Sequence, residues 1–246
     1  MNFELERAKL ILRQAGSGGA LRKGRNFLRL IRLLRHDPGL QQGDIGRLMN
    51  FIFKENGEVI SCLQVFSEIE QLLQLLKSVK PRVVLEIGTN RGGNLFLLTR
   101  TAAPDALIVS VDLPGGEFGG GYPLWRVPLY RNFAMQNQHV ELVRGNSHSP
   151  ETLCRAERKL DGRKVDFLFI DGDHTYEGVK QDYEMFSPLV REGGMIGLHD
   201  ILPAPGFPTC HVDKFWNELK NSHSNYLEFI HDRNQGWAGI GIVTKR

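Results

Sequence analysis

The chain has 246 residues and a formal net charge of +3, with 41% hydrophobic and 24% charged residues. These are ordinary globular values, and a chain of this length can form one α/β unit with a substantial core. No run approaches the roughly 18 apolar residues that a membrane span needs, and charged residues interrupt the N-terminus, unlike a secretory signal. The composition therefore disfavours membrane-spanning and secreted proteins.

The cysteines also disfavour a secreted protein. Cys62, Cys154 and Cys210 are few, odd in number and far apart, which disfavours a disulfide framework or a zinc site. We therefore expect a cytoplasmic enzyme or binding protein.

A basic segment opens the sequence. Residues 1–36 hold nine Lys or Arg against two Glu, and their pattern predicts helices broken by glycine at 16–19. The second helix carries an apolar stripe made of Leu21, Leu28, Ile31 and Leu34. We expect this stripe to pack on the catalytic domain, over the active site, or on another copy of the chain in a homo-oligomer. Nucleic acid is the disfavoured partner because no aromatic stacking platform accompanies the basic residues.

A second helix pattern follows over residues 63–78, so we assign residues 1–79 to an N-terminal helical extension. From residue 80 the pattern alternates between strand and helix. Apolar runs predict strands at 82–87, 107–111, 140–143, 165–170 and 194–198, with helices near 92–103, 151–160 and 176–190. Two further runs, 226–230 and 237–243, predict a final hairpin.

Short continuous apolar strands separated by helices are typical of a parallel sheet covered on both faces. Residues 80–246 are therefore predicted to form an α/β domain. Its sheet should be doubly wound, seven-stranded and mostly parallel, a Rossmann-like arrangement whose last strand is antiparallel. Ligands of such sheets bind at the carboxyl ends of the strands.

A glycine turn follows the first strand of this domain. It contains Gly88, Asn90 and Gly92, and it matches neither a dinucleotide fingerprint nor a phosphate-binding P-loop. Asp112 directly follows the second strand, where an acidic side chain can bind both ribose hydroxyls of a nucleoside. The pair indicates a nucleoside site, although such a turn alone could be a plain connection.

With these motifs, residues 80–246 resemble the class I S-adenosylmethionine-dependent methyltransferases. More narrowly, they resemble the branch with sugar O-methyltransferases and cephalosporin-hydroxylase-like proteins. The resemblance implies that Glu86 and the turn hold the amino-acid end of the cofactor, that Asp112 binds ribose, and that a polar residue within 145–149 borders adenine. The cofactor-binding residues so predicted are Glu86, Gly88, Asn90, Gly92, Asp112, Asn146, Ser147 and Asp171.

A second cluster of polar residues follows the fourth and fifth strands. Asp171 and His174 come after the fourth strand, and His199 and Asp200 end the fifth. The resemblance implies a divalent metal on Asp171, His199 and Asp200, with His174 as the base. Carboxylates suit Mg²⁺ and imidazole admits other ions, but His199 replaces a carboxylate of the family pattern. Mg²⁺, another divalent metal and no metal all remain open.

The chemistry explains this choice of residues. An alcohol or phenol oxygen is a poor nucleophile until a base or a metal weakens its O–H bond, and a histidine titrates near neutral pH. Asp171 and His174 are therefore the predicted catalytic residues. Simpler interpretations remain: Asp171, Asp173 or Thr175 could cap the helix near residue 176, and His199 could be a buried structural histidine.

Two loops and two tryptophans complete the pattern. Residues 113–123 contain five glycines and are expected to form a mobile lid or a plain insertion. Residues 203–208 are expected to line the acceptor pocket. Trp216 and Trp237 are expected in the core.

The favoured interpretation is a cofactor-dependent O-methyltransferase acting on a hydroxyl of a small molecule, with a sugar or glycosylated metabolite as the favoured acceptor. The alternative is an RNA-binding or RNA-modifying methyltransferase that uses the basic helix. A non-catalytic cofactor-binding or oligomerisation module is the third interpretation, which the cluster at Asp171, His174 and Asp200 disfavours.

Overall fold

The computed structural model describes residues 29–55, 59–116, 121–135 and 137–246. The glycine break at 16–19, the stripe residues Leu21 and Leu28, and part of the glycine-rich loop lie outside these ranges.

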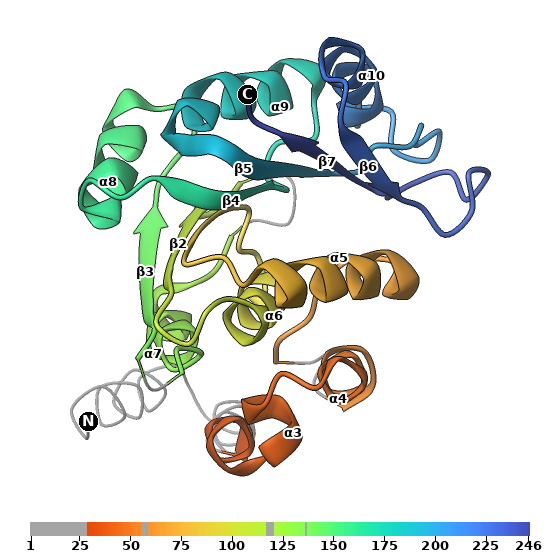
Figure 1. The fold of residues 1–246 in the computed structure, drawn as a ribbon. Helices are drawn as coiled ribbons and strands as arrows, with labels where there is room; N and C mark the ends of the chain where they lie inside the picture. Colours follow the sequence, from red (N-terminus) through yellow and green to blue (C-terminus); the bar gives the residue numbers. More distant parts are fainter. Residues whose placement is uncertain (1–28, 56–58, 117–120, 136) are drawn as a thin grey trace.

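Seven strands form one sheet in the order β3-β2-β1-β4-β5-β7-β6 (Figure 1). The strands are β1 (Val83–Ile87), β2 (Leu107–Asp112), β3 (His139–Arg144), β4 (Val165–Ile170), β5 (Val190–His199), β6 (Tyr226–Phe229) and β7 (Ile240–Thr244). The first five are mutually parallel, and β7 runs antiparallel to both β5 and β6. The predicted fold class, including the hairpin at the end, is confirmed.

Helices cover both faces of this sheet (Figure 1). One face packs against α5 (Phe66–Val79), α6 (Gly93–Thr101) and α7 (Val127–Arg131). The other packs against α8 (Pro150–Leu160), α9 (Tyr176–Phe186) and α10 (Val212–Ser222). Strands buried on both sides have no polar face, which is why their sequences are continuous apolar runs rather than alternating ones.

The described part of the N-terminal extension packs on the α/β domain. Residues 29–36 are helical, followed by α3 (Pro38–Gln41), α4 (Ile45–Asn50) and a π-helical turn at Phe51–Glu55. Ile31 and Leu34 of the predicted stripe are buried in the same apolar core as α5 and α6. These two described residues of the stripe thus have the domain itself as a partner. The boundary at 79/80 stays a prediction. Over the described ranges, no helix has the length and apolarity to cross a bilayer.

Several boundaries differ from the sequence predictions. The helix predicted to reach residue 190 ends at Phe186, because Pro188 lies in a 3₁₀ turn that leads into β5. The last strand begins at Ile240 rather than 237, because Ala238 and Gly239 have left-handed backbone angles. Four helices are not predicted by the sequence patterns: α3, α4, α7 and α10, of which all but α10 are too short to show a period.

Candidate functional site

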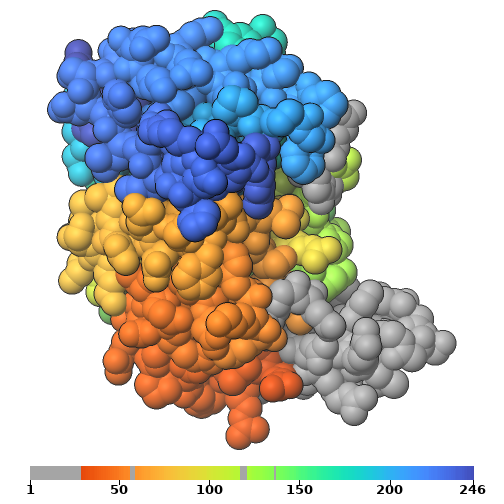
Figure 2. Space-filling model, turned by 90° about the vertical axis from the view of Figure 1, so that its right-hand side faces the viewer, coloured from red at the N-terminus to blue at the C-terminus, as the bar shows by residue number. Residues whose placement is uncertain are grey.

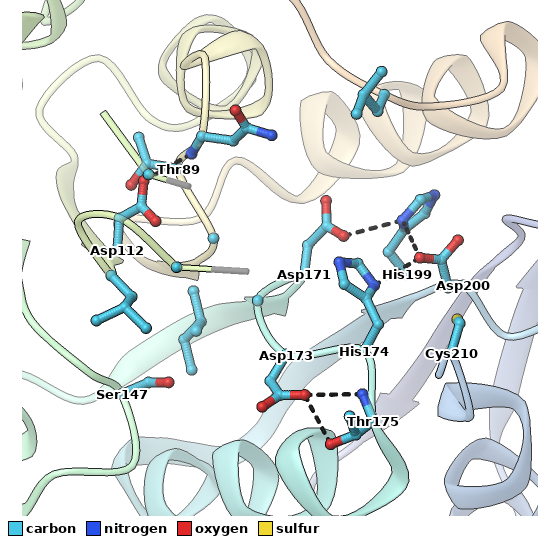
Figure 3. Close-up of a pocket in the computed structure, with 18 of the residues that line it drawn as sticks. Thr89, Asp112, Ser147, Asp171, Asp173, His174, Thr175, His199, Asp200 and Cys210 are labelled. Carbon is cyan, nitrogen blue, oxygen red and sulfur yellow. Dashed lines mark hydrogen bonds and ion pairs between the residues drawn. The ribbon is translucent and has the colours of Figure 1, made fainter. Parts of the chain in front are cut away.

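A cavity of about 990 Å³ opens at the carboxyl ends of β1, β2, β4 and β5. This is the edge of the sheet at which the sequence predicts a ligand. Its volume suits a nucleoside together with a second small molecule. Figure 3 shows Thr89 and Asp112 on one side of this space, and Asp171, His174, His199 and Asp200 on the other.

The loop after β1 forms one wall, and its backbone explains its glycines. Gly88 has φ of +99°, and a Cβ there would lie 1.9 Å from the carbonyl oxygen of Asp171. Gly92 has φ of +77°, and a Cβ there would meet the ring of Tyr130 at 2.5 Å. Only glycine accommodates both the backbone angle and the close approach. Gly88 lines the cavity, whereas Gly92 does not line it and packs against the ring of Tyr130.

Asn90 stands where a second glycine would be expected, and it also has a left-handed φ of 44°. Asparagine tolerates this region better than most residues. The backbone N–H of Asn90 donates to Oδ2 of Asp112 at 2.9 Å, and Tyr130 donates its hydroxyl to the Asn90 carbonyl at 2.9 Å. The departure from the glycine pattern is therefore compatible with a tight loop that is tied to the end of β2.

Asp112 lines the cavity at the end of β2. Burial raises the pKa of its carboxyl group to about 6, although N–H groups of Asn90 and Leu113 and the charge of Arg144 oppose the rise. Asn146 and Ser147, after β3, also line the cavity. The predicted ribose and adenine residues thus reach one common space.

Glu86 does not line this cavity. Its side chain is fully buried, and Ser110 donates its hydroxyl to the carboxyl group. Burial raises the pKa of Glu86 to about 8. The hydroxyls of Ser110 and Thr89 are hydrogen-bonded, and Thr89 lines the cavity. Glu86 therefore lies below the cavity floor and is connected to it only through two hydroxyl groups.

Two carboxylates and two imidazoles converge on the other side (Figure 3). Nδ1 of His199 lies 3.0 Å from Oδ1 of Asp171 and 3.4 Å from Oδ2 of Asp200. Nδ1 of His174 lies 2.8 Å from the same Oδ2 of Asp200. The four residues come from the ends of β4 and β5, which are neighbouring parallel strands. The predicted convergence of these residues is therefore present.

The electrostatics of this cluster favour charged imidazoles. Burial opposes protonation of His174, but the hydrogen bond with Asp200 and the negative charges nearby outweigh it, so the pKa of His174 is above its ordinary value. Burial is likewise outweighed at His199, whose pKa is raised well above its ordinary value by Asp171 and Asp200. Burial would raise the pKa of Asp200, but His199 and His174 hold it well below the usual range.

The sequence also predicts a divalent ion on this cluster. Donor atoms of Asp171, His199 and Asp200 lie within 4.8 Å of one another. However, the His199 ring stands between the two carboxylates, amide side chains engage the second oxygen of Asp171, and the backbone N–H of Ala238 engages that of Asp200. An ion would have to displace the imidazole proton and compete with these donors. The residues as arranged therefore do not fit a divalent metal.

The cap of α9 involves neighbours of Asp171 rather than Asp171 itself. Thr175 accepts from the N–H of Gly178, and Asp173 accepts from both the N–H and the hydroxyl of Thr175 (Figure 3). The capping interpretation thus holds for Asp173 and Thr175. The side chain of Asp171 is directed to His199.

Residues 85–201 match a family model described as "Methyltransferase domain". The match begins in β1 and ends just after β5, so it contains the glycine turn, Asp112 and the whole acid–histidine cluster. Residues 85–201, just under half of the chain, are therefore similar to a methyltransferase domain, and we call them the methyltransferase domain.

Solved structures share the fold of this methyltransferase domain and its flanking elements. The O-methyltransferase from Bacillus cereus in complex with SAH has a TM-score of 0.57 and 18% identity, over 83% of this chain and 90% of that one. The O-methyltransferase TomG from Streptomyces achromogenes, in complex with SAM, has a TM-score of 0.55 and 15% identity, over 82% and 89%. The predicted methyltransferase fold is confirmed, whereas the sugar-methyltransferase branch stays a prediction.

The curated relatives match this chain over only part of their own length. The uncharacterized protein y4gI of Sinorhizobium fredii is 28% identical over 149 residues, which are 59% of this chain and 16% of that protein. The uncharacterized protein R132 of Acanthamoeba polyphaga mimivirus is 29% identical over 122 residues, 47% of this chain and 50% of that protein. The chain thus spans half or less of the length of these relatives.

The methyltransferase domain receives an apolar wall from segments outside the matched range. Cys62 and Leu63 contribute from the N-terminal extension, and Phe207, Cys210 and Trp237 from the C-terminal part. Trp237 therefore lies at the cavity, contrary to the expectation of a core position, whereas Trp216 is buried as expected. Burial raises the pKa of the Cys62 thiol to about 12 and of Cys210 to about 11, so both stay protonated near neutral pH.

Two amide side chains of the site were not found from the sequence. Gln64 and Asn94 donate to Oδ2 of Asp171 at 2.9 and 3.1 Å. Since a carboxylate can only accept, these contacts fix which end of each amide faces it. Gln64 lies 107 positions before Asp171, so no local pattern could have paired them. Together with His199 they hold the Asp171 carboxylate in one orientation.

Proposed function

We propose that this chain transfers a methyl group from S-adenosylmethionine to a hydroxyl oxygen of a small molecule. The observation that carries the proposal is the arrangement of the cavity. A nucleoside-type carboxylate, Asp112, lines one side, and a histidine paired with a partly buried carboxylate, His174 with Asp200, lines the other. The O-methyltransferase structures named above, solved with SAH or SAM, support this choice of donor.

The donor would bind across the ends of β1, β2 and β3. Gly88 and Asn90 provide a backbone that approaches the ligand closely, and Asp112 provides two acceptor oxygens for ribose hydroxyls. Asn146 and Ser147 border the base. Of the first motif, Thr89 and Asn90 line the cavity, whereas Glu86 does not.

The transfer is an in-line displacement. The acceptor oxygen forms a bond to the methyl carbon while the bond from that carbon to the sulfonium sulfur breaks, and its electron pair stays on sulfur. The acceptor proton goes to His174. Nδ1 of His174 faces Asp200, so Nε2 is the ring atom that receives the proton. Asp200 orients the ring and stabilises its charged form.

Asp171 and His199 have a supporting role in this proposal. His199 joins Asp171 to Asp200, and the three residues present a fixed polar wall to the reacting oxygen. No step uses a metal, because the carboxylate oxygens are already engaged by N–H donors of the protein.

The acceptor is an uncharged small molecule in this proposal, with a sugar or glycosylated metabolite as the favoured class. None of the described residues that line the cavity is Lys or Arg, while Asp112, Asp171, Asp173 and Asp200 all line it. Such a lining offers no permanently charged cation to bind a phosphate or carboxylate group. It also disfavours RNA as the acceptor, since RNA binding relies on cationic contacts to phosphate.

The proposal is tested with methyl-labelled S-adenosylmethionine and the low-molecular-weight metabolites of cells that lack the protein. We expect label to enter a metabolite, and we expect His174→Gln to lower the rate by about 10²–10⁴-fold with little change in donor affinity. A wild-type protein that binds the donor but labels no small molecule, while it labels RNA, would reject the acceptor class. Equal rates for wild type and His174→Gln would reject the base.

A further inference from the structure

A buried carboxylate lies outside the methyltransferase motifs, on α5 of the N-terminal extension. Glu68 is 0% exposed. Its Oε1 accepts from the backbone N–H of His231 at 3.0 Å and from Nε2 of Gln235 at 2.7 Å, and its Oε2 accepts from the N–H of Gly239 at 2.9 Å. All three donors belong to the β6–β7 loop, residues 230–239. One acidic side chain therefore holds both ends of this loop.

The position of Glu68 suits a buried carboxylate, for which the described residues provide no cationic partner. It lies in the first turn of α5, where the N-terminal end of the helix dipole favours an anion. Three N–H donors then replace the water that burial removes. Figure 1 shows α5 next to the β6–β7 end of the sheet, and in Figure 2 residues near 230 lie directly on the face formed by α5.

The same loop reaches the acid–histidine cluster. The N–H of Ala238 donates to Oδ1 of Asp200 at 3.1 Å, and Oδ2 of Asp200 faces His174 at 2.8 Å. The segment after β5 is tied back to the loop, because Ile201 and Leu202 donate their N–H groups to the carbonyls of Gly239 and Ala238. Asp200 is thus held through the loop that Glu68 anchors.

Backbone strain is concentrated at this junction. Asp200 and Ala238 have left-handed φ angles of 61° and 63°, a backbone conformation that is unfavourable for a residue with a side chain. Such conformations persist only where surrounding contacts determine them, and they occur preferentially at functional sites. The backbone N–H of Gly239, the residue after Ala238, donates to Oε2 of Glu68. Glu68 therefore holds the backbone directly next to the strained residue Ala238.

We propose that Glu68 is a positioning residue of the methyl-transfer site. Its carboxylate holds the β6–β7 loop so that Ala238 fixes Asp200 opposite His174 and Trp237 forms part of the acceptor wall. The inference rests on the proposed function, because it assigns a role in orienting the base. A carboxylate is required, since its two oxygens accept three hydrogen bonds, whereas an amide would turn an NH₂ group toward at least one donor.

The test compares wild type with Glu68→Gln and with Glu70→Gln, a change of the same type on the same helix at a half-buried residue. The first readout is the low-field NMR signal of the His174 ring proton that faces Asp200, assigned by its loss in His174→Gln. The second is hydrogen exchange of the Ala238 amide. The third is calorimetric binding of S-adenosylhomocysteine, which reports on the donor side alone.

In Glu68→Gln we expect the ring-proton signal to shift upfield or disappear, and exchange at Ala238 to rise by about tenfold or more, while cofactor affinity stays within about twofold. Glu70→Gln should match wild type throughout. If Glu68→Gln fails to fold, Gln235→Ala, which removes one of the three contacts, should give the same changes in weaker form. A wild-type His174 signal and wild-type Ala238 exchange in the variants would overturn the inference. Absence of cofactor binding in wild type would reject the proposed function instead.

Discussion

Nδ1 of His174 lies 2.8 Å from Oδ2 of Asp200, and the Asp200 carboxylate is itself fixed by the N–H of Ala238 at 3.1 Å. These contacts couple the base to Ala238 of the β6–β7 loop. It makes the pH dependence of methyl transfer a direct report on the geometry of the site.

The first prediction concerns that pH dependence. His174 accepts a proton only when it is neutral, and its pKa is raised above the ordinary 6.5. Methyl transfer should therefore rise with pH through a midpoint above 6.5. In Asp200→Asn the pKa of His174 should fall because a hydrogen-bonded negative charge is lost. The midpoint should then move to lower pH, while the maximal rate decreases. A pH–rate profile for each protein checks this, and an unchanged midpoint in the variant would contradict the pairing.

The second prediction concerns metal dependence. Exhaustive chelation should leave methyl transfer unchanged, because the oxygens of Asp171 and Asp200 are engaged by protein N–H donors. Calorimetric titration of the wild type with Mn²⁺ should show no binding at this site. Loss of activity on chelation, restored by Mg²⁺ or Mn²⁺, would show that the His199 arrangement opens to admit an ion.

The third prediction concerns the glycine turn. Gly88→Ala should destabilise the fold severely, because the new Cβ would lie 1.9 Å from the Asp171 carbonyl at a φ of +99°. Gly115→Ala is a matched control: it also has a positive φ, but no heavy atom lies within 4 Å of its added Cβ. Thermal unfolding should show a large loss for the first change and a small one for the second. Equal losses would mean that backbone strain alone, not the approach to β4, determines Gly88.

The fourth prediction concerns Glu86. Its folded-state pKa is raised from 4.5 to about 8, so folding favours the neutral carboxyl group. Its contribution to stability is present in full below about pH 4.5 and is lost as the pH rises through about 8. Relative to Glu86→Gln, wild type should lose stability over this window, by about 1.4 kcal/mol per unit of pKa difference at most. Urea unfolding at several pH values measures the difference, and a constant difference would contradict a neutral Glu86.

Part of this structure could be predicted from residues alone. The parallel strands are continuous apolar runs, and residues that directly follow such strands, including Asp112, Asp171 and Asp200, must meet at one edge of the sheet. The sheet and both sides of the cavity follow from that rule. The individual contacts do not follow from that rule. Glu86 belongs to the first motif, yet its side chain is buried below the cavity floor.

The parts that could not be predicted depend on contacts across long stretches of chain. Gln64 binds Asp171 across 107 positions, and Glu68 binds the N–H of Gly239 across 171. Gln64 lies in the bend before α5 and Glu68 in the first turn of that helix. Polar side chains at such positions usually face solvent, so neither carries a local signal. The sequence predicts a core position for Trp237, but the residue lines the cavity. The left-handed backbone angles at Ala238 and Gly239 keep it out of the last strand, and an alanine in the sequence gives no sign of such an angle.

The most direct test of the central claim is calorimetric binding of S-adenosylmethionine to wild type, Asp112→Asn and Asp112→Ala. Wild type should bind, and Asp112→Ala should bind well over tenfold more weakly. Two charge-assisted hydrogen bonds to ribose are lost in that variant, each contributing roughly 1.5–3 kcal/mol, and Asp112→Asn should fall between the two. Asp173→Asn, at a side chain engaged with Thr175, should bind like wild type. No binding to the wild type, or equal binding to the Asp112 variants, would contradict the account.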